Sequence, residues 1–118
     1  MLKNNGHNGA SVVLLKKRVV NWATRIGVDV KQIHVRPMTN KWASCSTTGR
    51  VSLATDVLPL NSKLQDYIIV HELLHLRVPN HGKLWKSLMR AYVGNYEKLE
   101  RGLQRSCLRA IPTKHLKP

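Results

Sequence analysis

The feature of this sequence that most constrains its fold is an apolar segment with polar residues in its middle. Between Tyr67 and Leu76 nearly every side chain is apolar, and the exceptions are His71, Glu72 and His75. A segment that is apolar almost all round is typical of a buried helix. Burying a carboxylate there is costly unless something compensates its charge. The segment therefore predicts a buried helix that carries a specific polar site.

The spacing of the two histidines indicates a metal site. His71 and His75 are four residues apart, so they project from the same face of a helix and can bind one ion together. Glu72 can then reach a water molecule at that ion, which is the HExxH arrangement of zinc peptidases. Imidazole ligands favour zinc, which keeps one position open in catalytic sites. We therefore expect one zinc ion per chain, with Glu72 as the general base.

A third ligand is expected where this helix ends. Val78 precedes a proline, which disfavours helical backbone angles, so the helix should stop there and the chain can fold back. His81 follows almost at once and is the favoured third ligand. Glu97 is a rival at a larger offset. The alternative for the whole motif is a pair of core histidines bonded to carbonyl groups, with Glu72 paired to a basic residue.

Periodicity predicts the elements around this helix. Ser62 and Gln65 form a capping box that should start it. The other predicted elements are a helix at about 10–26, a strand at 33–35, a loop at 39–49, a strand at 51–55, and helices at about 82–92 and 96–108. Asn95 is the expected cap of the last helix. The strand at 51–55 is expected to pair with the first strand and to hold an extended substrate at the cleft edge.

Two of these helices have predicted inward faces. The inward positions are Val12, Val13, Val19, Val20, Ala23 and Ile26 in the first helix, and Leu84, Trp85, Leu88 and Met89 in the helix at 82–92. The chain of 118 residues fits one domain. We expect a flexible Asn/Gly-rich end at 1–9, the folded domain at 10–108 and a basic tail at 109–118.

The charge of the chain favours anionic partners. Its formal net charge is +14, from 20 Lys and Arg residues against six Asp and Glu residues. Nucleic acid is one such partner, and a solvated basic surface is the alternative. Two groups of basic residues share a helix face and are candidates for phosphate contacts; they are Lys83, Lys86 and Arg90, then Arg101, Arg105 and Arg109.

The cysteines and the hydropathy indicate the cellular environment. Cys45 and Cys107 are far apart and neither lies in a CxxC pair, so the sequence indicates neither a thiolate zinc site nor a disulfide framework. A reduced, cytoplasmic environment is the simpler expectation. No segment approaches the length that a membrane span requires, so no membrane partner is expected.

Several runs of the sequence resemble the YgjP-like metallopeptidase family over roughly residues 10 to 100. The residues that carry the resemblance are Arg36, Met38, Lys41, Trp42, Ser44 and Cys45, then Val70 through Leu76, then Asn80, His81 and Trp85. The SprT-like proteases, which act on proteins crosslinked to DNA, are similar more distantly through an HExxH and a later His-Gly. The resemblance implies a minimal zincin-like α+β domain with about four helices. In it a small antiparallel sheet packs on the metal-binding helix and His81 is the third ligand.

The function expected from these residues is hydrolysis of peptide bonds in a peptide or protein substrate, through a zinc-activated water. Tyr92, Tyr96 and Trp42 are candidates for contacts with the substrate or the transition state. The segment from Trp42 to Cys45 has two interpretations: it lies beside the cleft with Cys45 near the metal, or it is a turn with a buried Trp anchor and a core thiol. The alternative function is a basic nucleic-acid-associated metalloprotein, whose metal is structural or whose protease activity is directed to DNA-bound proteins.

Overall fold

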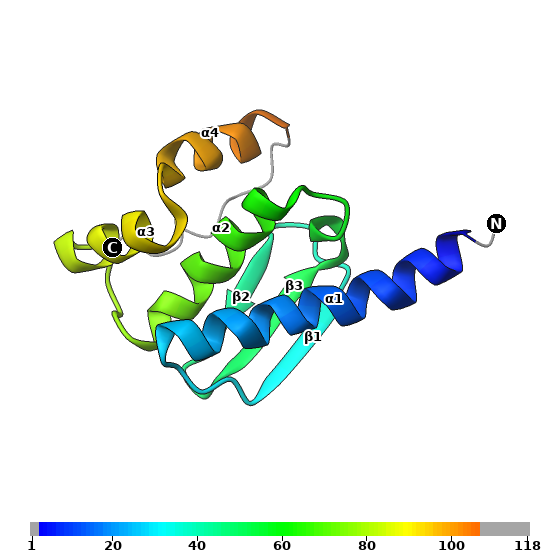
Figure 1. Cartoon of the computed structure of the whole chain (residues 1–118), viewed down its shortest axis with the longest axis horizontal. Helices are drawn as coiled ribbons and strands as arrows, with labels where there is room; N and C mark the ends of the chain where they lie inside the picture. Colours follow the sequence, from blue (N-terminus) through cyan, green and yellow to red (C-terminus); the bar gives the residue numbers. More distant parts are fainter. Residues whose placement is uncertain (1–2, 107–118) are drawn as a thin grey trace.

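A computed structural model describes residues 3–106, in which four α-helices and a three-stranded sheet form an α+β fold (Figure 1). Side chains are described from residue 11 to residue 104. The predicted basic tail, with Arg109 and Cys107, lies outside these residues. The elements are α1 (Lys3–Ile26), β1 (Gln32–Arg36), β2 (Ala43–Cys45), β3 (Arg50–Ala54), the 3-10 turn η1 (Thr55–Val57), α2 (Ser62–Leu73), the 3-10 turn η2 (Leu74–Leu76), α3 (Lys83–Val93) and α4 (Tyr96–Ser106).

Helix α2 is the centre of the molecule. It packs against α1, α3, α4 and β2. In Figure 1 the sheet lies behind α1 and α2, while α3 and α4 lie on the side of α2 away from α1. Every α2 side chain from Tyr67 to Leu73 is buried, which confirms the predicted buried helix. Each fully buried Leu, Ile or Val contributes about 1.5–3 kcal/mol, so this helix holds the layers together.

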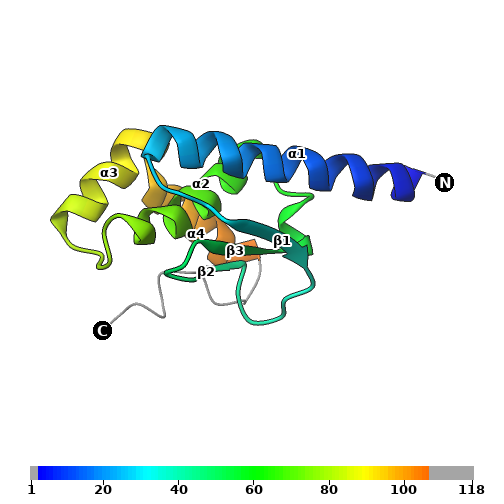
Figure 2. The ribbon, with the colours of Figure 1, turned by 90° about the horizontal axis from the view of Figure 1, so that it is seen from below.

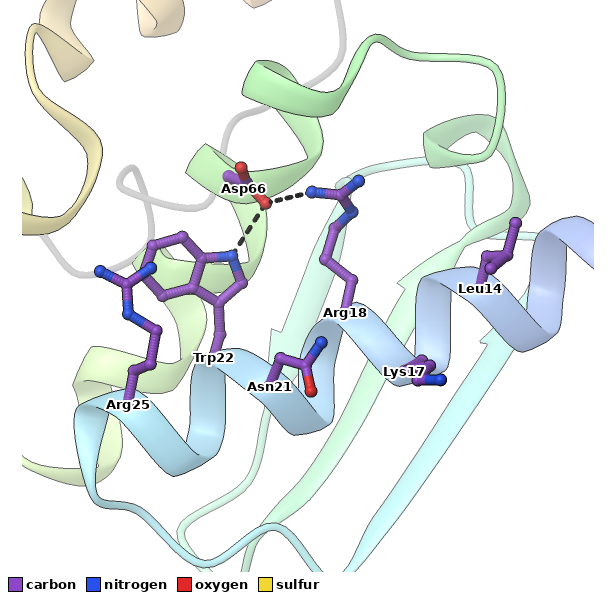
Figure 3. Close-up of a pocket in the computed structure, with 7 residues that line it drawn as sticks. All are labelled: Leu14, Lys17, Arg18, Asn21, Trp22, Arg25 and Asp66. Atoms are coloured by element: carbon purple, nitrogen blue, oxygen red, sulfur yellow. Dashed lines mark hydrogen bonds and ion pairs between the residues drawn. The ribbon is translucent and has the colours of Figure 1, made fainter.

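The contact between α1 and α2 includes a polar bridge. Asp66 of α2 accepts hydrogen bonds at 2.8 Å from the Arg18 guanidinium and at 2.8 Å from the Trp22 indole N–H (Figure 3). Both donors come from α1 and are one turn apart on the same face of that helix. The bridge therefore fixes the rotation of α1 against α2.

The sheet is mixed, and the expected antiparallel sheet is wrong for one of its two strand pairs. The strand order is β1-β3-β2, with β1 parallel to β3 and β2 antiparallel to it. A parallel pair needs a long crossover connection, and residues 37–49 supply it. That connection contains β2, where the sequence predicts a loop because the surrounding residues are rich in Ser, Thr and Gly. The central position of β3 also corrects the expectation that residues 51–55 line a free edge.

The inward face of α1 differs from its prediction. Val13 is 64% exposed and Val20 is 51% exposed, whereas Leu15 and Trp22 are buried. The buried stripe is Leu15, Val19, Trp22, Ala23 and Ile26. The helix also begins at Lys3 rather than near Ala10, so residues 3–9 are helical in the structure. This first part of α1 projects past the sheet (Figures 1 and 2), where no other described element covers it.

The helix ends agree with the sequence to within a few residues. Asn61 caps α2, because its side-chain oxygen accepts the Leu64 N–H at 2.9 Å, so the predicted cap at Ser62 is one residue late. The Gln65 side chain instead donates to the carbonyls of Val57 and Leu58. Leu84 is 61% exposed, contrary to its predicted inward position, whereas Trp85 and Met89 are buried as predicted.

The cap predicted for the last helix is confirmed. The Asn95 side-chain oxygen accepts the Lys98 N–H at 3.3 Å, at the first turn of α4. As for membrane insertion, none of the described helices is both long enough and apolar enough to cross a bilayer.

Candidate metal centre

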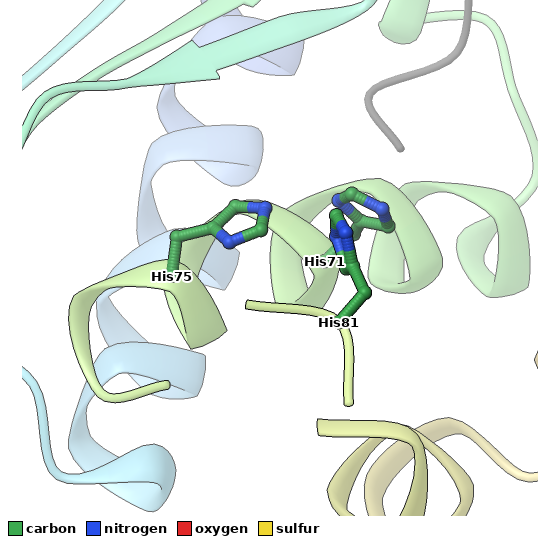
Figure 4. A group of neighbouring side chains, drawn as sticks. All are labelled: His71, His75 and His81. Carbon is green, nitrogen blue, oxygen red and sulfur yellow. The ribbon is translucent and has the colours of Figure 1, made fainter. Parts of the chain in front are cut away.

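Three histidines from three consecutive segments meet at one end of α2. His71 lies in the last turns of α2, His75 lies in η2, and His81 lies in the segment just before α3. Their rings point toward one another (Figure 4). One ring nitrogen from each histidine lies within 4.8 Å of one ring nitrogen from each of the other two. His71 is fully buried, and His75 and His81 are half-buried.

This donor set fits a zinc ion. A tetrahedral zinc bound at 2.0–2.1 Å to each nitrogen separates the nitrogens by about 3.4 Å. The nitrogens here all lie within 4.8 Å of one another, so the three rings would have to draw closer together on binding the ion. Imidazole ligands bind zinc and also other transition metals such as copper, iron and nickel. Among the described residues, this is the group of His, Cys, Asp and Glu side chains that could hold a metal.

The local backbone explains how His81 returns to the helix. After Leu73 the helix tightens into η2, and the N–H groups of Arg77 and Val78 both donate to the Leu74 carbonyl. The Asn80 side chain then accepts the Gly82 N–H at 2.9 Å, which closes a turn around His81. A Cβ atom at Gly82 would lie 2.9 Å from the Asn80 oxygen, so a larger residue would push this turn open. Asn80 and Gly82 therefore shape the turn that carries His81.

Glu72 lies beside the histidines in an almost dry environment. It is 2% exposed, and one of its carboxylate oxygens is 3.5 Å from His71 Nδ1. Its charge acts on neighbouring groups. The pKa of Tyr67 is raised far above its usual value, mainly by burial and further by the charges of Glu100 and Glu72. The carboxylate is thus held in the low-dielectric interior, where electrostatic interactions are strong.

Two buried aromatic residues, which the sequence does not assign to the metal site, also line the histidine group. Trp85, 2% exposed, has its ring centroid 4.3 Å from that of His81, 5.0 Å from that of His71 and 6.4 Å from that of His75. The Tyr67 ring meets His71 edge-on at 5.7 Å. Spacing is the signal that could have found them: Tyr67 lies one helical turn before His71, and Trp85 lies in the first turn after His81.

A family model described as YgjP-like, metallopeptidase domain, matches residues 10–106. The chain belongs to the YgjP-like family. It is therefore a metallopeptidase, a class of hydrolase that acts on proteins or peptides.

Solved structures agree with this assignment. One similar structure is the metallopeptidase zymogen of Pyrococcus abyssi abylysin, with a TM-score of 0.72, 19% identity, and coverage of 82% of this chain and 98% of that chain. Another is the metallopeptidase zymogen of Methanocaldococcus jannaschii jannalysin, with a TM-score of 0.70, 26% identity, and coverage of 78% and 95%. No curated protein matches the sequence. The abylysin likeness shows the fold.

Strand β2 of this YgjP-like protein lies close to Glu72. The pKa of Cys45 is raised to about 12, first by burial and second by the charge of Glu72. This location corresponds to the interpretation that puts the segment beside the cleft. Trp42, directly before β2, is 4% exposed, which corresponds to the alternative of a buried anchor. The segment thus combines a buried aromatic residue with a thiol next to the site.

The remaining candidates lie at different distances from the histidines. Tyr96 is buried against Trp85, with ring centroids 5.8 Å apart. Tyr92 instead packs edge-on against Trp22 of α1 at 5.9 Å. Glu97, the rival third ligand, accepts hydrogen bonds at 3.0 and 3.1 Å from Arg90, and it is not in the histidine group.

The predicted phosphate-contacting residues form an incomplete surface in the described part of the chain. Lys83, Lys86 and Arg90 of α3 are exposed, and so is Arg101 of α4. Arg90 is already paired with Glu97, which reduces the charge that it offers to an anion. The side chain of Arg105 lies outside the described residues, as does Arg109. Phosphate binding at these two ridges stays a prediction.

Proposed function

We propose that this YgjP-like protein is a zinc-dependent peptidase in which His71, His75 and His81 bind the metal and Glu72 is the general base. The observation that supports the proposal most strongly is the convergence of three imidazoles within 4.8 Å beside a buried carboxylate. A bound zinc ion would supply Lewis acidity, which lowers the pKa of a water molecule and polarises the substrate carbonyl.

The side chain of Glu72 carries the proton transfers in this proposal. Its carboxylate accepts a proton from the attacking water and then donates it to the leaving amine. Burial at 2% exposure excludes bulk water from the carboxylate, so its interactions with the reacting groups are stronger than in solution. Trp85 and Tyr67 pack against the histidine rings and exclude water from the buried side of the metal site. Among the described residues, neither the Trp85 indole N–H nor the Tyr67 hydroxyl has a hydrogen-bond partner.

The free edge of the sheet suits an extended peptide. Strand β2 pairs with β3 through Ala43, Ser44 and Cys45, and within residues 3–106 no strand pairs with its other edge. Backbone groups on such an edge can bind a substrate as an added strand. Because β2 packs on α2 and Cys45 senses the charge of Glu72, a peptide bound there would lie next to the general base.

A structural metal in a nucleic-acid-associated protein is less well supported. Closed structural zinc sites have four protein ligands, whereas catalytic sites have three and a position for water. The group in the described residues has three members. Its position beside a sheet edge and a buried carboxylate also favours catalysis over a structural role.

Metal content with matched histidine variants tests the proposal. Wild-type protein should bind one zinc ion per chain and cleave an unstructured protein such as casein. His81→Ala should lose most of its zinc and its activity. His34→Ala is the matched control, because His34 is exposed on β1, away from the group. Glu97→Gln should also keep its zinc. A His81→Ala protein with wild-type zinc affinity would overturn the ligand assignment.

A further inference from the structure

A second charged site lies on the contact between α1 and α2. An open pocket of about 410 Å³ is lined by one face of α1 and by Asp66 of α2 (Figure 3). Three cationic side chains line it, Lys17, Arg18 and Arg25, together with the amide of Asn21. Asp66 is the acidic residue among its lining residues. None of these residues belongs to the histidine group.

The charge of Asp66 is already used inside the pocket. Its Oδ1 atom accepts from Arg18 and from the Trp22 indole, each at 2.8 Å. All six acidic residues of the chain lie within the described residues, and none forms an ion pair with Lys17 or Arg25. Two positive charges of the pocket are therefore uncompensated.

The Arg25 guanidinium is held in place before any ligand arrives. Its central carbon lies 4.3 Å from the ring centroid of Trp22 and 5.9 Å from that of Tyr92. Figure 3 shows it beside the Trp22 ring. A stacked guanidinium loses less rotational freedom on binding, and its planar fork of N–H groups matches the oxygens of a phosphate.

We propose that this pocket binds a dianionic phosphate group, as in inorganic phosphate or a phosphate monoester. Such a group carries about −1.5 to −2 charges at pH 7, which matches the two uncompensated cations. Arg25 donates its fork, Lys17 supplies a point charge, and the Asn21 amide can donate one further hydrogen bond. Arg18 stays on Asp66 and shapes the floor of the pocket.

Titration by NMR at constant ionic strength tests this assignment. The reporter is the Trp22 indole N–H, which lies in the pocket and is bonded to Asp66. Inorganic phosphate should shift this signal saturably, and added salt should weaken the binding. Acetate should bind more weakly, because it carries one negative charge. The absence of a saturable shift with phosphate would refute the proposal.

Charge-matched variants separate the pocket from general basicity. Lys17→Gln with Arg25→Gln should weaken phosphate binding at least tenfold. Arg50→Gln with Lys98→Gln removes the same charge from exposed positions on β3 and α4, outside this pocket and outside the two predicted ridges, and should bind phosphate as the wild type does. Equal weakening in both variants would show that only net charge matters, and the proposal would fail. Arg25→Lys, which keeps the charge and loses the stacked fork, should bind with intermediate affinity.

A single-stranded oligonucleotide without a terminal phosphate distinguishes the source of the group. Its backbone offers phosphodiesters, each with one negative charge, so it should shift the Trp22 signal less than an oligonucleotide of the same sequence with a 5′-phosphate. If the unphosphorylated strand binds the pocket and inorganic phosphate does not, the site is a nucleic-acid groove and the monoester assignment is wrong.

Discussion

Helix α2 carries two carboxylates, Asp66 and Glu72, whose surroundings differ in kind. The Asp66 side chain is 25% exposed and is bonded to an arginine and to an indole N–H from α1. The Glu72 side chain is 3% exposed and lies 3.5 Å from His71, one of three converging imidazoles. One charge is compensated by a permanent cation, whereas the other lies where a metal can bind. In a chain with net charge +14, this difference distinguishes a structural acid from a candidate catalytic one.

The energies of the two sites differ in the same way. Partly exposed ion pairs such as that of Arg18 and Asp66 contribute little, about 1 kcal/mol or less, because water screens them. A charge in the interior costs several kcal/mol before compensation. Buried charges that destabilise the fold are found mainly at functional sites, where the charged group takes part in binding or catalysis. The comparison therefore predicts opposite outcomes for neutralising the two residues.

The largest expected effect is on catalysis by Glu72→Gln. Without a general base, kcat should fall by about 10²–10⁴-fold. Zinc should stay bound, because the carboxylate is not among the proposed ligands. Asp66→Asn should leave kcat near the wild-type value and lower the free energy of unfolding by only about 1 kcal/mol, since Arg18 and Trp22 keep an oxygen acceptor that has lost its negative charge. Casein cleavage, zinc content and urea unfolding measure the three quantities. Normal cleavage by Glu72→Gln would end the assignment of the base.

The next effect separates the two tryptophans that accompany the carboxylates. Trp85 and Trp22 are both buried, at 2% and 7% exposure, so replacing either by Ala should cost about 3–5 kcal/mol of stability. Only Trp85 contacts the three histidine rings. Trp85→Ala should therefore also lower zinc affinity by about 10–100-fold, as other supporting residues around metals do.

Zinc competition with a coloured chelator measures this affinity, under conditions where both variants are folded. Trp22→Ala is the control for lost stability and should bind zinc as the wild type does. If both variants lose zinc affinity equally, Trp85 acts through general stability alone, and its assignment as a positioning residue would be wrong.

Much of the candidate site was predictable because it is local. His71, Glu72 and His75 lie within one helical segment, so their spacing alone places the two histidines on one face and Glu72 beside them. His81 could be inferred because a proline ends the helix shortly before it. The contribution of Trp85 was not inferred, since a tryptophan among apolar residues is indistinguishable from an ordinary core residue in the sequence.

The sheet was less predictable because strand pairing is not local. Strand β2 has three residues, too few for a periodic pattern, and its neighbours are turn-forming residues. The parallel pairing of β1 with β3 depends on where the connection between them runs, which no residue in either strand encodes. In α1, the positions of Val13 and Leu15 differ by two residues, and packing against α2 and β1 decides which of them faces inward.

The smallest expected effect is on the pKa of the Cys45 thiol, which is raised by the charge of Glu72 and not by that of Asp66. In metal-free protein its pKa is raised to about 12, with burial as the larger cause and the charge of Glu72 as the smaller. Glu72→Gln should therefore lower this pKa and leave it above 9.0, the ordinary value, whereas Asp66→Asn should not change it. The measurement is the rate of Cys45 alkylation at a fixed alkaline pH, in a Cys107→Ser background. Glu72→Gln should raise this rate, and Asp66→Asn should not.

The same raised pKa makes the fold less stable in alkali. As the pH rises above 9.0, the unfolded chain loses the thiol proton while the folded chain, with a pKa of about 12, still keeps it. Proton loss then favours the unfolded state, so stability falls between these two values. Cys45→Ser removes this contribution and should show a shallower alkaline decline in urea unfolding. A decline as steep as that of the wild type would mean that the thiol is not shielded in solution, and that Glu72 does not act on β2 as the comparison requires.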